Sequence, residues 1–210
     1  MSDHQPLTGL ILAGGKSTRF GSDKATTMLA GRMLVEWVAR ALGTACERIV
    51  VVRAAGQHIP RFDAAVPVAM VEDIYEAKGP LAGLVAGFRA TDTPLAFAAS
   101  CDVPLIEPVL VSGLASLAAT HDIVIPQVDG FLQPLLAVYR PAGCLPVFER
   151  AIERDVLKIT AAYGGLRVRI AREHDLRDLG STLESFANLN RAEDLARIES
   201  VLLARDRPLP

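Results

Sequence analysis

The chain has 210 residues, half of them hydrophobic and 22% charged, a composition that allows one buried core and excludes a disordered or low-complexity protein. The 22 Lys and Arg residues nearly balance the 24 Asp and Glu residues, and the net charge of −2 argues against nucleic acid as a partner. No stretch reaches the roughly 18 uninterrupted apolar residues of a membrane-spanning helix. Because residues 1–6 also lack the pattern of a signal peptide, we expect a cytoplasmic protein with no membrane attachment.

The hydrophobic pattern predicts strands and helices that alternate along the chain. In chain order we expect a strand at Leu7–Leu12, a helix at Met33–Leu42, strands at Arg48–Arg53 and Val66–Val71, a helix at Leu81–Arg89, a strand at Leu95–Ser100, a helix at Val109–Ala119, strands at Ile123–Ile125 and Leu135–Tyr139, a helix at Pro141–Ile152, a strand at Leu166–Ala171 and a helix at Arg191–Leu203. In the last strand, Val168 and Ile170 alternate with two arginines. In the last helix, Leu195, Ile198 and Leu202 share one side.

This alternation predicts an α/β fold of three-layer αβα, Rossmann-like architecture with a mainly parallel central sheet. No internal repeat or linker is visible, so we expect a single domain over residues 1–210, with an ordered core from about residue 7 to about residue 204. The three cysteines, Cys46, Cys101 and Cys144, lie far apart, which predicts reduced thiols rather than disulfides or a structural zinc site.

The most informative segment follows the first predicted strand and reads L-A-G-G-K-S-T-R-F-G-S-D-K over residues 12–24. Its three glycines let backbone N–H groups approach an anion closely, and Lys16, Arg19 and Lys24 place three cations around the same loop. This combination suits a triphosphate. The segment is neither a P-loop nor a dinucleotide-binding G-x-G-x-x-G motif, and the alternative is a flexible turn with solvated charges.

The segment resembles the L-A-G-G-x-S-x-R-x-G-x-D-K signature of the molybdenum cofactor guanylyltransferases, a branch of the nucleotidyltransferase superfamily. Shorter matches follow in the family's order, at Gly31-Arg32, Val71-Glu72-Asp73, Gly79-Pro80-Leu81-Ala82-Gly83, Cys101-Asp102-Val103-Pro104, Gln133-Pro134-Leu135 and Phe186-Ala187-Asn188-Leu189-Asn190. The resemblance runs from about Gly9 to Leu195. The first loop is specific as a combination, whereas each shorter match would be weak alone.

The resemblance implies an enzyme that transfers GMP from GTP to molybdopterin bearing molybdenum and releases pyrophosphate. The terminal phosphate of the cofactor would attack the α-phosphorus of GTP, and because that phosphate is already ionised, no general base is required. Catalysis would then consist of positioning and charge neutralisation by Lys24, Arg19 and a Mg²⁺ ion bound to Asp102. The resemblance also implies transient contact with molybdoenzymes or cofactor-handling proteins.

The residues implied to bind substrates fall into two sets. The nucleotide set is Leu12, Ala13, Gly14, Gly15, Lys24, Asp73 and Asp102, and the set for the pterin substrate is Gly79, Pro80, Leu81, Gly83, Asn188 and Asn190. Simpler explanations remain open for several of them. Asp102 could cap the next turn, Asp73 could be a solvated loop acid, Gly79–Gly83 could merely begin a helix, and Asn190 could cap the last one.

Gly14-Gly15 favours GTP, because the guanylyl branch resembles L-A-G-G and the cytidylyl branch resembles L-A-A-G. A glycine leaves more room for a purine, although one methyl group discriminates by only about 1–3 kcal/mol. Two positions depart from the family: Arg53 stands where an Asn that helps to bind nucleotide is frequent, and Arg191-Ala192 replaces the usual Thr-Pro. The alternatives are a cytidylyltransferase for the same cofactor, a sugar-phosphate nucleotidyltransferase, and a nucleotide- or cofactor-binding carrier without catalysis.

Overall fold

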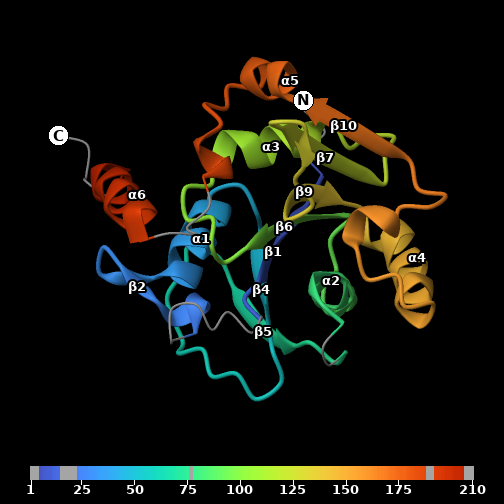
Figure 1. Ribbon diagram of the computed structural model, residues 1–210, viewed down its shortest axis with the longest axis horizontal. Helices are drawn as coiled ribbons and strands as arrows, with labels where there is room; N and C mark the ends of the chain where they lie inside the picture. Colours follow the sequence, from blue (N-terminus) through green and yellow to red (C-terminus); the bar gives the residue numbers. More distant parts are fainter. Residues whose placement is uncertain (1–4, 15–22, 76–77, 188–191, 206–210) are drawn as a thin grey trace.

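The computed structural model describes residues 5–14, 23–75, 78–187 and 192–205 of the chain. A central sheet of eight strands runs through the molecule (Figure 1). Its strands are β1 (Leu7–Leu12), β4 (Arg48–Arg53), β5 (Val68–Glu72), β6 (Leu95–Ser100), β7 (Ile123–Val128), β8 (Phe131–Leu132), β9 (Leu136–Tyr139) and β10 (Val168–Arg172). They lie in the order β10-β7-β9-β6-β1-β4-β5, and β8 pairs with β7.

The sheet is mainly parallel, as the sequence predicts. β6, β1, β4 and β5 form a continuous parallel block, and β10 is parallel to β7. β9 is antiparallel to both β6 and β7, which makes the sheet mixed near its middle. The apolar, partly β-branched runs of β1, β4 and β6 are buried on both faces, which explains why these strands begin and end where the sequence predicts.

Helices cover both faces of the sheet (Figure 1). The helices are α1 (Leu34–Leu42), α2 (Pro80–Arg89), α3 (Pro108–Ser116), α4 (Pro141–Glu153) and α5 (Glu173–Asp178). α1, α3 and α5 contribute to the core cluster on one face, whereas α2 and α4 contribute to the cluster on the other. Alternate residues of β4 enter the two clusters, with Val51 on the α1 side and Val52 on the α2 side. The predicted three-layer, Rossmann-like fold is therefore confirmed.

A third apolar cluster joins the C-terminal helix α6 (Ala192–Arg205) to the hairpin of β2 (Met28–Leu29) and β3 (Arg32–Met33). Ile198 and Leu202 of α6 are buried there, as the sequence predicts, beside Trp37 of α1. The Glu199 carboxylate also accepts a hydrogen bond from the backbone N–H of Ala30 at 3.2 Å. The β2–β3 hairpin, which precedes α1, is thus held in place by the C-terminal helix.

The expected pattern of the late strand is only partly correct. Alternation would place Val168 and Ile170 together on one covered face, but Ile170 is 46% exposed and Ala171 is fully buried. β10 is an edge strand, and the cluster beneath α4 reaches Val168 but not Ile170. Ala171 instead packs in the opposite cluster with Leu176 of α5, a short helix that the sequence pattern does not predict.

Along the described ranges, no helix combines the length and apolar character that crossing a membrane requires. The three cysteines, Cys46, Cys101 and Cys144, are free and buried. Burial raises the pKa of each thiol to about 12, so none of them is a reactive thiolate near neutral pH.

Candidate active site

The carboxyl ends of four neighbouring strands meet at one edge of the sheet. In the strand register, Leu12 of β1 lies opposite both Val52 of β4 and Ser100 of β6, and Arg53 lies opposite Glu72 of β5. From β1 the chain continues to β4 on one side, whereas from β6 it continues toward β9 and β7 on the other. The strand order therefore reverses between β1 and β6, and ligands of open α/β sheets bind at such a point.

Two of the three predicted catalytic residues meet at this edge. Lys24 opens the 3₁₀ turn η2 (Lys24–Thr26), and Asp102 lies in the turn after β6. The Lys24 Nζ donates to Asp102 Oδ2 at 2.8 Å, and the two side chains are only 16% and 23% exposed. The fold thus joins a cation and a carboxylate from distant parts of the sequence. The third predicted catalytic residue, Arg19, lies outside the described residues, as do Gly15, Asn188 and Asn190.

Asp23 shapes the turn that carries Lys24. Its carboxylate Oδ1 accepts from the backbone N–H of Ala25 at 3.0 Å, which caps η2. Its other oxygen, Oδ2, accepts from the Gln57 side-chain amide at 2.5 Å. The same amide nitrogen also donates to the Ala13 carbonyl at 3.1 Å, directly after β1. Sequence reasoning missed Gln57, because no motif or periodic pattern includes it; the family signature points only to Asp23.

Leu12, Ala13 and Gly14 can reach a nucleotide only through their backbone. The Leu12 and Ala13 side chains are buried, and the N–H groups of Ala13 and Gly14 both donate to the Val52 carbonyl, at 2.8 and 3.2 Å. A Cβ added to Gly14 would lie 2.9 Å from the backbone nitrogen of Ala54. The close passage of the β4 turn is therefore one reason for glycine at this position, separate from the predicted room for a purine.

Arg53, the departure from the family pattern, is held within the protein. Its guanidinium pairs with Glu72 Oε1 at 2.8 Å and donates to the Gln57 carbonyl. Among the described side chains, the Arg53 Nε is buried without a hydrogen-bond partner. Arg53 thus fixes the turn after β4 from the β5 side.

Asp73 lies at the same edge, one strand beyond Arg53. Its backbone N–H donates to the Arg53 carbonyl at 2.8 Å, and its Oδ1 accepts from the Tyr75 N–H at 2.9 Å. Burial raises the pKa of the Asp73 carboxyl group, and the hydrogen bond from Tyr75 opposes that shift. In the structure the Asp73 side chain stabilises the turn at Tyr75. Its contact with nucleotide stays a prediction.

The Gly79–Gly83 segment does begin a helix. Gly79 caps α2 with a φ of +71°, Pro80 occupies the first turn, and both are exposed. The Leu81 side chain is fully buried. A Cβ on Gly83 would lie 3.1 Å from Leu12 Cδ2, so this glycine lets α2 lie directly on β1. Of the four, only Gly79 and Pro80 are exposed, and their contact with the pterin substrate stays a prediction.

Asp102 is the candidate for metal binding. Among the residues that the structure describes, no group of three or more His, Cys, Asp or Glu side chains forms a metal cage. Mg²⁺ commonly takes one or two carboxylates from a protein and fills its remaining positions with water and phosphate oxygens. A single, partly exposed carboxylate beside Lys24 fits that requirement.

Glu107 immediately precedes α3. It connects the loop between β6 and α3, which contains Asp102, to residues 181–185. This carboxylate is 7% exposed and accepts hydrogen bonds from the Ser181 and Ser185 hydroxyls, at 2.7 and 3.0 Å, and from the backbone N–H and hydroxyl of Thr182, at 2.9 and 2.8 Å. Burial is the largest influence on its pKa and raises it. The four hydrogen bonds together outweigh burial and lower the pKa below its usual value of 4.5.

We expect Glu107→Gln to lower the free energy of unfolding at pH 7 by about 2–4 kcal/mol, because an amide cannot accept all four bonds. A folded-state pKa below the unfolded one contributes stability above pH 4.5 that is lost as the pH falls through the folded value. The difference in free energy of unfolding between the variant and wild type should therefore become smaller below pH 4.5. Urea unfolding across pH, with the exposed Glu47→Gln as control, measures this, and a pH-independent difference would contradict the assignment.

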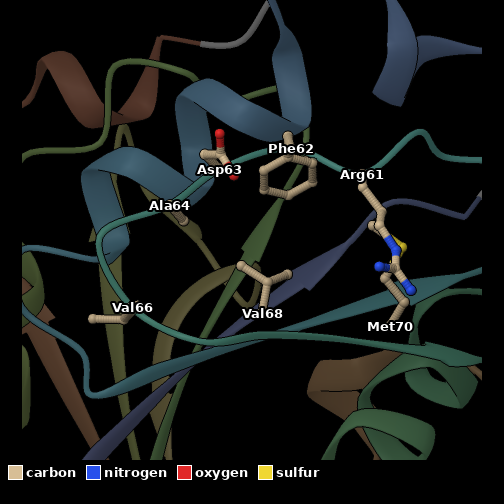
Figure 2. A pocket seen from close by; sticks show the side chains of 7 residues that line it. All are labelled: Arg61, Phe62, Asp63, Ala64, Val66, Val68 and Met70. Atoms are coloured by element: carbon tan, nitrogen blue, oxygen red, sulfur yellow. The ribbon is translucent and has the colours of Figure 1, made fainter.

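A surface cavity of about 640 Å³ is lined by other residues. Figure 2 shows that its lining side chains come from β5 and from the segment that precedes it, and they are Arg61, Phe62, Asp63, Ala64, Val66, Val68 and Met70. None of them is a predicted site residue. The candidate site is therefore the sheet edge around Lys24 and Asp102.

Comparison with known proteins finds matches in sequence and in structure over most of the chain. Residues 9–171 match the family model of the MobA-like NTP transferase domain. The chain is 33% identical to the molybdenum cofactor guanylyltransferase of Desulfosudis oleivorans over 94% of this chain and 96% of that protein. It is also 33% identical to the probable molybdenum cofactor guanylyltransferase of Bacillus subtilis, covering 90% and 93% of the two chains. The crystal structure of molybdopterin-guanine dinucleotide biosynthesis protein A from Archaeoglobus fulgidus has a TM-score of 0.76 and 28% identity, covering 94% and 99%.

Proposed function

Because the chain belongs to the family of MobA-like NTP transferase domains, we propose that it transfers GMP from GTP to molybdenum-bearing molybdopterin and releases pyrophosphate. The observation that carries the proposal is the contact between Lys24 and Asp102, which lies at the reversal of strand order. Guanylyltransferases among the relatives, matched over nearly their full length, support the choice of nucleotide and acceptor.

The reaction needs no protein base. An ionised oxygen of the pterin's terminal phosphate forms a new bond to the α-phosphorus of GTP, and the bond from that phosphorus to the bridging oxygen of the β-phosphate breaks. Pyrophosphate leaves with the electron pair, and a diphosphate bridge joins the pterin to GMP. The protein contributes alignment of the two phosphates and neutralisation of their charge.

The residues divide this work between them. Lys24 provides a cation for the triphosphate, and Arg19 is proposed to provide another. GTP is proposed to bind with its base near residues 12–15 and its phosphates along residues 15–24. Asp102 would bind Mg²⁺, which when bound neutralises the α- and β-phosphates and stabilises the departing pyrophosphate. Gly79, Pro80, Asn188 and Asn190 are proposed to contact the pterin substrate.

The test offers GTP and CTP together to the purified protein, with Mg²⁺ and molybdopterin, and follows nucleotide consumption and pyrophosphate release. We expect GTP to be consumed with at least about tenfold preference in kcat/KM. Pyrophosphate should appear only when the pterin is present. Preferential use of CTP would identify a cytidylyltransferase. A parallel assay replaces molybdopterin with a sugar phosphate, and pyrophosphate release only in that assay would identify another acceptor. Binding of GTP without pyrophosphate release would favour a carrier protein.

Two further expectations depend on this function and remain predictions. The product is a cofactor that other enzymes use, so we propose transient contact with molybdoenzymes or cofactor-handling proteins. We also propose that the protein acts in the cytoplasm.

A further inference from the structure

Gln57 connects three segments of the candidate site through one side chain. Its Nε2 donates to Asp23 Oδ2 at 2.5 Å and to the Ala13 carbonyl at 3.1 Å, and its Oε1 accepts from the Ala54 N–H at 2.8 Å. Ala13 follows β1, Ala54 follows β4, and Asp23 immediately precedes Lys24. A primary amide suits this position because it donates and accepts at the same time, which neither a carboxylate nor an ammonium group can do.

The position of Gln57 itself is fixed by the turn after β4. Its backbone N–H donates to the Ala54 carbonyl at 3.0 Å, and its own carbonyl accepts from the Arg53 guanidinium. Arg53 is in turn paired with Glu72 on β5. The backbone of Gln57 is thus fixed, and its side chain extends toward Asp23 from a defined point.

These hydrogen bonds affect which carboxylate pairs with Lys24. Asp23 is adjacent to Lys24 in the chain and could compete with Asp102 for its ammonium group. Each oxygen of Asp23 already accepts one hydrogen bond, however, Oδ1 from the Ala25 N–H and Oδ2 from the Gln57 amide, and these bonds fix the direction of the carboxylate. Because both donors are neutral, they orient Asp23 without adding a cation to the site. Lys24 is then directed to Asp102, with which it pairs at 2.8 Å.

We propose that Gln57 is a positioning residue of the nucleotide site: it holds Asp23 away from Lys24, so that Lys24 points across the sheet edge toward Asp102 before substrate binds. The proposal rests on the proposed function for its kinetic consequences. Its geometric part, the orientation of Lys24, can be tested without turnover.

The first experiment compares Gln57→Met, which keeps the size of the side chain but removes its hydrogen bonds, with Gln127→Met as the matched control. Gln127 is also partly buried, and within the described part of the chain its side-chain amide donates only to the Gly130 carbonyl of its own hairpin, at 3.2 Å. We expect Gln57→Met to lower kcat/KM for GTP about 10- to 50-fold and to leave KM for the pterin substrate within about twofold of wild type. The melting temperature should stay within about 5 °C of the control. An equal loss for both substrates, or no loss, would overturn the proposal.

A double-mutant cycle tests whether Gln57 acts through Asp23. If it does, Gln57→Met combined with Asp23→Ala should impair kcat/KM for GTP about as much as the more severe single change. Losses that multiply would show two independent roles and would overturn the proposal. The cycle is informative because it isolates the effect of the direct contact between the Gln57 and Asp23 side chains.

A crystal structure of Gln57→Met separates failure of this inference from failure of the proposed function. We expect the Lys24 ammonium to be shared between Asp23 and Asp102, or to have moved to Asp23. An unchanged pairing of Lys24 with Asp102 alone would overturn the inference, whatever the enzyme's activity. If Lys24 moves but wild-type protein consumes no GTP, the positioning role stands and the proposed function fails.

Discussion

Replacing Lys24 with methionine is expected to lower kcat with GTP about 10²- to 10³-fold while the protein stays folded. Methionine retains most of the aliphatic length but removes the ammonium group that pairs with Asp102. The negative charge that develops on the departing pyrophosphate is then stabilised by one preorganised cation fewer. Since the interaction is realised mainly in the transition state, we expect kcat to change more than KM for GTP.

Steady-state kinetics with a matched control checks this expectation. Lys158→Met removes a lysine that is exposed at the start of the turn η3 (Ile159–Ala161), and it should leave both kcat and KM unchanged. Thermal melting shows whether each variant is folded. A folded Lys24→Met protein with wild-type turnover would remove Lys24 from the mechanism.

Asp102→Asn is expected to have an effect at least as large, with kcat lower by about 10³-fold. Asparagine has the same shape, and its carbonyl oxygen can still accept from Lys24, so the fold and the turn after β6 should persist. The negative charge that attracts a divalent cation is lost. We therefore expect the Mg²⁺ concentration for half-maximal activity to rise, which a merely structural role would not produce.

The matched control is Asp92→Asn, because Asp92 pairs with Arg48 on the surface, ahead of β6, and is exposed. Activity titrated against Mg²⁺ should follow the wild-type curve in this variant. Binding of Mn²⁺ to the GTP complex, measured by electron paramagnetic resonance, gives a readout without turnover. Unaltered metal affinity in Asp102→Asn would assign the metal to other ligands.

Much of the sheet could be predicted because its strands carry strong local signals. β1, β4 and β6 are short apolar runs bounded by polar or turn residues, and they are buried on both faces. The hairpin β2–β3 and the helix α5 are too short to establish a hydrophobic period. They depend on tertiary contacts, which Leu29 makes with α6 and Leu176 makes with Ala171 of β10. Ile170 shows the limit of alternation, since a two-residue period does not indicate where the neighbouring layer of helices ends.

In the candidate site, too, some features have local sequence signals and others depend on tertiary contacts. Lys24 and Asp102 each stand in a recognisable motif, but their contact depends on the neighbouring positions of β1 and β6 in the sheet, which no local pattern encodes. Gln57 belongs to no motif and becomes visible only when the turns after β1 and β4 lie together. Gly14 is recognisable in sequence, whereas its close approach to Ala54 is a property of the packed backbone.

The glycines of α2 determine how closely this helix packs on β1 beside the candidate site. A Cβ on Gly83 would press on Leu12, and one on Gly87 would lie 2.2 Å from Cδ1 of the fully buried Leu10. Helix and strand are therefore already at their minimum separation, and no larger residue could be inserted between them without wedging the layers apart. Because Gly79 caps the same helix, the close packing of α2 on β1 also fixes how far the proposed pterin-contacting residues Gly79 and Pro80 lie from the end of β1.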